Sequence, residues 1–232
     1  MSLLPRKLTV EFIGTFFLMF TIGTAVATAG TLAPLAIGSA VMVMVFSGGH
    51  ISGGHYNPAV STAVFARGKM TLTEYVTYIL AQAVGALAAG AIIRGVFPVH
   101  APAATAGSGK MLLVEFLFTF ALCYVVLNVA TTRDTENNSF YGLAIGFTVA
   151  TGAFAVGKIS GGAFNPAVAL GASVLGLFMW SHIWIYLLAE LVAAFAAAGV
   201  FLFTQPGERA GGQVRAAEPG SEIGRRVLDP AA

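Results

Sequence analysis

The sequence predicts an all-α integral membrane protein built from an inverted repeat, and three observations carry that prediction. Of the 232 residues, 57% are hydrophobic and only 9% are charged, and the mean hydropathy is +0.83. Such a composition belongs to a chain whose surroundings are mostly lipid. Six apolar runs are near, or slightly short of, the roughly 20 residues that cross a bilayer. The third observation is a ten-residue motif that occurs twice, at 51–60 and at 159–168.

The duplication reaches well beyond this motif. Its two copies read ISGGHYNPAV and ISGGAFNPAV, and their asparagines, Asn57 and Asn165, stand 108 positions apart. At the same offset the tetrapeptide LAIG at 35–38 recurs at 143–146. We therefore expect one membrane domain over 1–204 that contains two copies of a structural unit, at about 8–96 and about 111–204.

Spanning helices are expected wherever an apolar run is bounded by turn-like residues. The first run differs from a signal peptide, because it carries Glu11, has no convincing cleavage site and belongs to the repeat. We therefore expect it to stay in the mature chain. In chain order, the six expected spans are 8–29, 35–50, 71–96, 111–130, 140–157 and 182–204.

Each Asn-Pro pair, one in each repeat, predicts a helix that is too short to span. Asparagine is a favoured N-cap residue, and proline fits the first helical position. After Asn57 the apolar stretch 59–66 ends at an Arg-Gly-Lys turn, which leaves about 15 Å of helix, half of a bilayer core. Non-helical backbone at this depth must be buried in protein or line a water-filled cavity. Segments 52–56 and 160–164 are therefore expected to edge a passage, with their paired glycines letting the backbone run extended.

The topology follows from the number of spans. Because each repeat carries three spans, the second copy must enter the membrane from the opposite side, which makes the repeat inverted and brings the two Asn-Pro-Ala loops together near the midplane. The positive-inside rule then places both termini in the cytoplasm, and we expect the plasma (inner) membrane as the location. From about Gln205 the chain turns polar, which predicts a disordered cytoplasmic tail over 205–232.

Several classes of function find no support in the sequence. The single cysteine, Cys123, lies within the fourth span, so it offers neither a disulfide framework nor a cysteine-based metal site. A formal net charge of +2 does not suggest a nucleic-acid partner. No nucleophile with a base, metal-binding cluster or phosphate-binding loop is visible. We therefore expect no enzymatic activity, no catalytic residue, no metal and no cofactor.

With its paired motifs, the chain resembles the aquaporin (major intrinsic protein) superfamily from about 8 to 203. The resemblance implies a right-handed bundle of six tilted helices with two re-entrant half-helices, one pore per subunit, and a homotetramer embedded in lipid. The pore centre would be formed by Asn57, Pro58, Ala59, Asn165, Pro166 and Ala167, whose two asparagine amides donate hydrogen bonds to the passing solute. A ladder of acceptor carbonyls would come from Gly54, His55, Tyr56, Gly161, Gly162 and Ala163.

The half-helices also imply how ions are excluded. Two N-termini, each equivalent to roughly +0.5 charge, converge on the midplane and repel cations and hydronium. A neutral solute meets no such barrier, and water can be held there without a continuous proton wire. The resemblance therefore implies a passive channel for water or small neutral solutes.

Four filter positions are found by counting from the asparagines, and they read Ile37, Ala153, Gly162 and Val168. Family members that select water have an aromatic residue, a histidine, a small polar residue and an arginine there, and glycerol-conducting members keep the arginine beside two aromatics. Valine at the arginine position is similar to some plant tonoplast-type and bacterial metalloid-linked members. The filter is therefore expected to be wide and apolar, and to suit water, ammonia, hydrogen peroxide, urea, glycerol and undissociated metalloid acids. The filter would be narrower than these four residues suggest if Phe154, Phe164 or a residue of the 97–110 loop folded over it.

Several polar residues admit two interpretations. Glu11 and Glu115 stand 104 positions apart near the starts of the first and fourth spans, and an intramembrane carboxylate is a functional candidate by default. The family resemblance favours a bracing role, in which both accept hydrogen bonds from the re-entrant loops. Gln82 and Glu190, which correspond in the repeat, are expected to do similar work. His55 is either a loop brace or part of a pH gate.

Two other function classes stay open beside the passive channel. A coupled secondary transporter also uses inverted repeats and broken helices, but it normally displays a binding-site carboxylate or an ion-coordinating cluster at the midplane. A gated or non-conducting scaffold could retain the same fold, although nothing bulky or charged stands at the four filter positions.

Overall fold

The computed structural model of the chain describes residues 3–97 and 107–208, and in these residues it contains helices and no strand. Six helices are long and apolar enough to cross a membrane, as the sequence predicted. They are α1 Leu4–Thr28, α2 Ala33–Ser52, α4 Leu72–Val96, α5 Ser108–Ala130, α6 Tyr141–Ser160 and α8 Ile183–Thr204. The two expected half-helices are α3 Pro58–Ala66 and α7 Pro166–Leu175.

The helix ends agree with the predicted spans to within a few residues, and the later ends of α2 and α6 have a physical cause. Helices α2 and α6 run two or three residues further than expected and end at Gly53 and Gly161. These glycines have φ values of 92° and 95°, a left-handed conformation that stops a helix and that only glycine adopts freely. The expectation of extended glycines was therefore wrong, because Gly54 and Gly162 are also left-handed and the chain turns back sharply at each pair.

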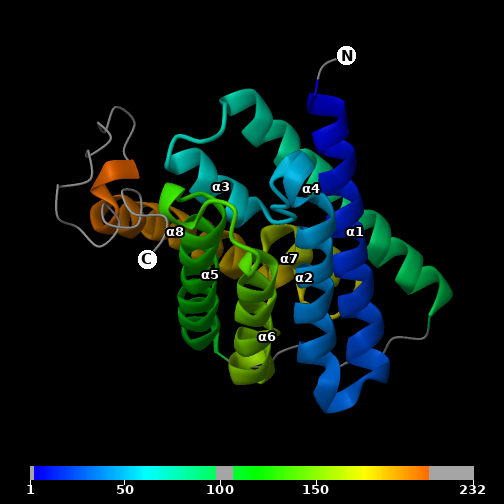
Figure 1. Cartoon of the computed structure of the whole chain (residues 1–232). Helices are drawn as coiled ribbons and strands as arrows, with labels where there is room; N and C mark the ends of the chain where they lie inside the picture. The colour runs from blue at the N-terminus through cyan, green and yellow to red at the C-terminus, as the bar shows by residue number, and fades with distance from the viewer. Residues whose placement is uncertain (1–2, 98–106, 209–232) are drawn as a thin grey trace, which may run out of the picture.

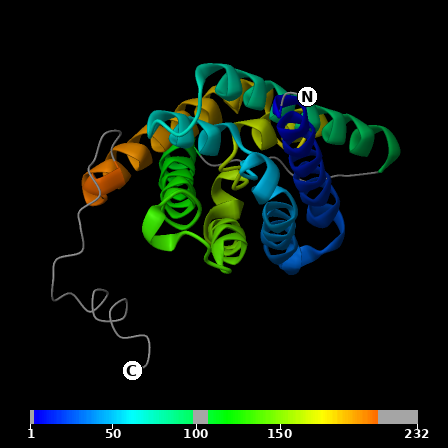
Figure 2. The ribbon, with the colours of Figure 1, turned by 45° about the horizontal axis from the view of Figure 1, so that its top comes forward.

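The spanning helices pack mainly as three pairs: α1 with α4, α5 with α8, and α2 with α6. Figures 1 and 2 both place α1 and α2 on one side of the molecule, α5 and α6 on the other, and α2 beside α6 in the middle. The α2–α6 contact depends on Gly38 and Gly146. A Cβ atom on either glycine would lie 2.5 Å from the carbonyl oxygen of the other, so the two backbones can approach this closely only without side chains.

The half-helices tie the two repeats together. Helix α3 of the first repeat packs mostly on α8 of the second, and α7 of the second repeat packs mostly on α4 of the first. Gly90 and Gly171 make the second contact possible, because a Cβ on Gly90 would lie 2.5 Å from the Gly171 carbonyl oxygen. Neither half-helix can therefore be held in place without the opposite repeat.

The outer surface of the bundle suits a lipid environment. Large apolar side chains stay exposed along the spanning helices, as in Leu80, Val84, Leu188, Phe195 and Phe203. Exposed residues of this kind over several helices are typical of a surface that faces hydrocarbon or a partner subunit.

The end of α8 differs from the expected tail. Residues 206–208 form a short 3₁₀ helix, Pro206–Glu208, and Glu208 lies against the body of the protein, where its carboxylate is 2.8 Å from the Arg67 guanidinium. The folded part therefore continues past the expected boundary at 205. The rest of the expected tail, 209–232, lies outside the described residues.

Candidate functional site

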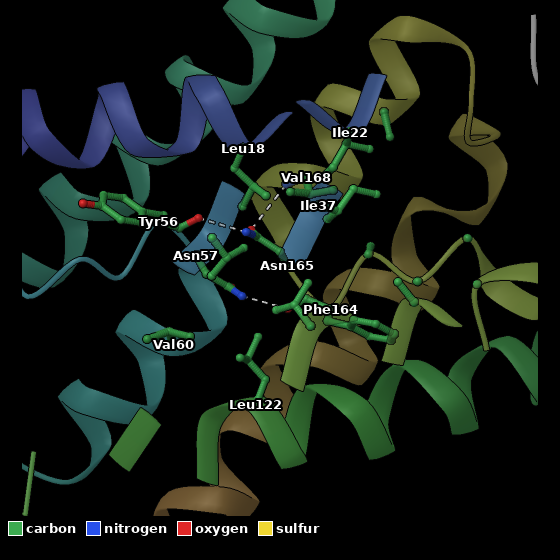
Figure 3. A pocket seen from close by; sticks show the side chains of 18 of the residues that line it. Leu18, Ile22, Ile37, Tyr56, Asn57, Val60, Leu122, Phe164, Asn165 and Val168 are labelled. Atoms are coloured by element: carbon green, nitrogen blue, oxygen red, sulfur yellow. Dashed lines mark hydrogen bonds between the residues drawn. The ribbon is translucent and has the colours of Figure 1, made fainter. Parts of the chain in front are cut away.

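Two asparagine side chains meet at the centre of the bundle. Asn57 caps α3 by accepting a hydrogen bond from the Ala59 N–H at 2.8 Å, and Asn165 caps α7 by accepting from the Ala167 N–H at 3.0 Å. Each amide nitrogen also donates across the repeat, Asn57 to the Phe164 carbonyl at 2.7 Å and Asn165 to the carbonyl before Asn57 at 2.9 Å (Figure 3). One N–H of each amide then has no partner among the described residues, and both asparagines line a cavity.

The residue before each asparagine has an unfavourable backbone conformation. Tyr56 and Phe164 both have φ of 49°, a region that bulky residues rarely adopt. This conformation persists only where the surroundings impose it. Here buried carboxylates hold the loops in this conformation: Glu11 holds the first loop and Glu115 holds the second.

Glu11 is surrounded by hydrogen-bond donors. It is fully buried and accepts from the backbone N–H groups of His55 and Tyr56 at 3.0 and 2.7 Å. It also accepts from the Ser52 hydroxyl at 2.7 Å and the Gln82 amide at 2.8 Å. Four donors on one carboxylate hold the first loop rigidly, because each donor satisfies part of a charge that would otherwise be costly to bury.

Glu115 holds the second loop in a corresponding way. It accepts from the N–H groups of Ala163 and Phe164 at 3.1 and 2.9 Å. Its neighbour Glu190 corresponds to Gln82 but cannot donate an amide hydrogen, and its two buried oxygens have the Asn165 backbone N–H and the Glu115 carboxyl as polar neighbours. Gln82 and Glu190 therefore both lie against a loop carboxylate, but only Gln82 supplies an amide donor to one. The two carboxyls lie within hydrogen-bond reach of each other.

His55 contributes to the first loop through its ring as well as its backbone. Its Nδ1 lies 3.0 Å from the Ser61 hydroxyl, and the ring stands edge-on to Tyr78 at a centroid distance of 5.3 Å. Ser61 in turn accepts from the Gln82 amide at 2.9 Å. These contacts favour the interpretation of His55 as a loop brace over that of a pH gate.

The cavity at the centre has a volume of about 430 Å³ and brings together residues from both repeats. All four predicted filter residues line it, namely Ile37, Ala153, Gly162 and Val168. The six predicted carbonyl residues line it as well: Gly54, His55, Tyr56, Gly161, Gly162 and Ala163. The prolines and alanines of the two motifs do not line it; they are buried at the starts of α3 and α7, where they form helix rather than wall.

The carbonyl ladder is not uniform. The Tyr56 carbonyl accepts the Asn165 amide, so one of its two acceptor positions is used inside the protein. The other predicted carbonyls accept no hydrogen bond from the described residues, which leaves them free for a solute. The Phe164 carbonyl, which the sequence analysis did not include, stands in the same position as that of Tyr56 and accepts from Asn57.

The two phenylalanines considered as plugs differ in position. Phe154 is 57% exposed and does not line the cavity. Phe164 does line it, but its ring is buried against Phe118 and Gly152. Most of the 97–110 loop, residues 98–106, lies outside the described residues.

Sequence reasoning missed most of the apolar wall, including Leu18, Ile22, Leu122 and Val126. These four come from α1 and α5, and they form two pairs at the offset of 104 positions that relates Glu11 to Glu115. That offset was visible in the sequence. Which face of each helix points inward was not, because both helices are apolar all round.

Metal chemistry has no obvious place in the described part of the chain. No group of three or more His, Cys, Asp or Glu side chains in residues 3–97 and 107–208 is arranged to hold a metal ion.

Comparison with known proteins agrees with this architecture. The sequence model of the family described as Major intrinsic protein matches residues 2–201. The glycerol uptake facilitator protein-like 6 of Lactiplantibacillus plantarum is 39% identical over 207 residues, which is 83% of this chain and 95% of that protein. Aquaporin NIP1-3 of Oryza sativa subsp. japonica is 39% identical over 209 residues, which is 84% of this chain and 72% of that protein. The fold matches the X-ray structure of the aquaglyceroporin from Plasmodium falciparum with a TM-score of 0.74 and 23% identity, over 85% of this chain and 95% of that chain.

Proposed function

The chain belongs to the major intrinsic protein family, whose members are membrane channels, and from that premise we propose that it conducts small neutral solutes through a wide, uncharged filter. The observation that carries the proposal is the central cavity, which passes both asparagine amides and all four filter positions. Since Val168 stands where an arginine would supply a fixed charge and a fork of donors, the filter discriminates by the cost of dehydration and not by charge.

The same wall accounts for ion exclusion and passive flow. A solute at the centre accepts a hydrogen bond from the free N–H of Asn57 or Asn165 and donates to the loop carbonyls. The N-termini of α3 and α7 point toward this place, and their positive ends raise the energy of any cation there. No carboxylate is among the described residues that line the cavity, and a coupled transporter normally displays one, or an ion-coordinating cluster, at the midplane, which favours passive flow over coupled transport.

The proposed solutes are water, urea, glycerol, ammonia, hydrogen peroxide and undissociated metalloid acids. All are small and neutral, so none meets the electrostatic barrier at the midplane. Glycerol is the first solute to test, because a 39% identical relative is named a glycerol uptake facilitator-like protein.

Stopped-flow measurements on proteoliposomes test this proposal. The unaltered protein is expected to carry water in response to an impermeant osmolyte, and to give reswelling when urea or glycerol is the osmolyte. Val168→Arg is expected to abolish the reswelling, because it adds bulk and charge to the filter. Val168→Leu is the matched control, since it adds bulk without charge and so separates the two effects. Fluxes equal to those of empty liposomes would instead support the gated or non-conducting alternative.

We also propose a homotetramer in the plasma (inner) membrane with both termini in the cytoplasm. The support for the orientation is the uneven distribution of basic residues, since Lys7, Arg67 and Arg133 lie at the helix ends near the termini and Arg94 lies at the opposite ends of α4 and α7. Native mass spectrometry of the extracted protein tests the assembly, and a monomer as the main species would contradict it.

A further inference from the structure

The inverted repeat gives the filter a counterpart on the other side of the asparagine pair. We call Ile37, Ala153, Gly162 and Val168 the filter ring. Moving each position by 108 gives a second set, the mate ring, which consists of Ile145, Val45, Gly54 and Val60. All members of both rings line the same cavity. Figure 3 places Ile37 and Val168 on one side of the asparagines and Val60 on the other.

The two rings differ in how much of them a water molecule can reach. In the filter ring only Val168 is buried, with 2% of its surface exposed, while the other three members are partly exposed. In the mate ring all four members are buried, and the exposed fractions are 2% for Val45, 3% for Val60 and 5% for Ile145. When residues line a passage but expose almost no surface to water, the passage between them has little room. We therefore infer that the mate ring surrounds a narrower opening than the filter ring.

The same contrast holds for the next residues along the wall. Ile22 of α1 lies near Ile37 of the filter ring (Figure 3) and is partly exposed, whereas its counterpart Val126 of α5 is 6% exposed. In the rings themselves, Ala153 corresponds to Val45. The mate ring therefore carries one larger side chain and has less exposed members.

The continuity of the cavity points the same way. Beyond the filter ring the cavity continues to the exposed residues Val26 and Lys158, so this ring does not interrupt it. On the other side a separate cavity of about 430 Å³ begins one helical turn past the mate ring, at Gly49, Ala130 and Tyr141. Across the described residues the two cavities have no lining residue in common. The boundary between the two cavities thus lies within about one helical turn of the mate ring.

We propose that the mate ring, and not the filter ring, sets the largest solute that passes through this channel. The inference rests on the proposed function and deepens it, because it assigns size selection to Val45, Val60 and Ile145. An opening lined by apolar side chains and one glycine carbonyl offers few hydrogen bonds in place of those that a solute loses with its hydration water. Widening it is therefore expected to help a solute with several hydroxyl groups and a larger cross-section, such as glycerol, more than water.

Identical substitutions in the two rings test the proposal. Val60→Ala and Val168→Ala remove the same atoms at corresponding and equally buried positions. In stopped-flow measurements on proteoliposomes, Val60→Ala is expected to raise the ratio of glycerol to water permeability severalfold, and Val168→Ala is expected to leave it nearly unchanged. An equal or larger increase for Val168→Ala, or no change for Val60→Ala, would overturn the proposal while leaving the channel function intact.

A second pair guards against a variant that fails to fold. Val45→Ala gives the mate ring the residue of the filter ring, and Ala153→Val does the reverse. The first is expected to raise the glycerol-to-water ratio, and the second to leave it unchanged, because the filter ring stays the wider of the two. A fall in the ratio for Ala153→Val counts against the proposal. If the unaltered protein carries neither water nor glycerol above empty liposomes, the proposed function fails, and the size-selection inference fails with it.

Discussion

At the residue scale, one pair of corresponding residues distinguishes the two loops. Gln82 donates its amide to Glu11 and to Ser61, whereas Glu190 brings a second carboxyl, and no amide donor, to Glu115. An amide N–H beside a buried carboxylate gives it a permanent hydrogen bond. The first loop carboxylate therefore has an amide donor that the second one lacks.

Exchanging these two residues is predicted to have opposite effects. Glu190→Gln supplies a permanent N–H donor to Glu115, so we expect it to stabilise the protein by about 1 kcal/mol. Gln82→Glu removes the donor to Glu11 and adds a second acidic group, so we expect a loss of about 1–3 kcal/mol. Thermal unfolding in detergent, followed by circular dichroism, measures both. A lower Tm for Glu190→Gln would mean that the Glu190 carboxyl has a donor or a role that glutamine cannot replace.

At the element scale, close helix approach depends on where glycine meets backbone. Gly38 and Gly146 allow α2 and α6 to touch, and the nearest atoms to a Cβ on either one include the backbone of the opposite helix. A flexible side chain can move away from an added methyl group, but a helix backbone moves only if the whole helix shifts. These positions therefore determine the separation of the two repeats at the pore wall, since both helices contribute wall residues.

Gly146→Ala is predicted to destabilise the protein by about 1–3 kcal/mol or more, because the added methyl group overpacks the α2–α6 contact. The matched control is Gly199→Ala in α8, where a Cβ meets nothing within 4 Å. That change is expected to be neutral or to stabilise by up to about 1 kcal/mol, since alanine favours helix. Thermal unfolding in detergent measures both, and an equal loss for the two variants would show that helix packing is not the cause.

At the scale of the whole molecule, one ionic cluster joins three distant parts of the chain. The Arg67 guanidinium, after α3, is buried and pairs with Glu208, beyond α8, at 2.8 Å. Its cationic carbon lies 4.7 Å from the centre of the Phe201 ring, and it donates to the carbonyl and hydroxyl of Thr131, after α5. Glu208 also accepts from the Arg133 N–H at 2.8 Å. The cluster fastens the end of the last helix to the half-helix of the opposite repeat.

This cluster predicts a dependence of stability on pH. Burial alone raises the pKa of the Glu208 carboxyl, but the hydrogen bonds from Arg133 and Arg67 outweigh it and hold the pKa below its ordinary value of 4.5. A carboxyl with a lower pKa in the folded chain stabilises the fold above its unfolded pKa, and this contribution is lost as the pH falls through the folded pKa. We therefore expect the Tm to fall between about pH 5 and about pH 3.

Glu208→Gln tests the source of that dependence. The variant is expected to have a lower Tm at neutral pH, by an amount that corresponds to about 3–5 kcal/mol if Arg67 stays buried without its anion. It should also lose less stability on acidification than the unaltered protein. Arg94→Gln, at the opposite end of α4, is the control for an arginine that only hydrogen-bonds a carbonyl. Identical acid profiles for Glu208→Gln and the unaltered protein would exclude Glu208 as the titrating group.

The sequence by itself determined the class, the number of spans and the two half-helices. Apolar length, an Asn-Pro start and a repeat of 108 positions are local or periodic features, and each has a direct structural meaning. Family membership followed from the same motifs. The filter positions were predicted by counting from the asparagines, and all four residues line the central cavity; their role as the filter stays a prediction.

Only the tertiary structure decided which residues line the cavity and which partners the buried polar residues have, because both depend on contacts between helices of different repeats. The inward faces of α1 and α5 are apolar like their outward faces, so no periodicity marks Leu18 or Val126 as wall residues. The partners of Glu190 differ from those of Gln82, which their corresponding positions in the repeat did not indicate. The pairing of Arg67 with Glu208 joins residues 141 positions apart. The physical reason is the same in each case: burial and hydrogen-bond partners are properties of a packed interface, and they are set by atoms that lie far away along the chain.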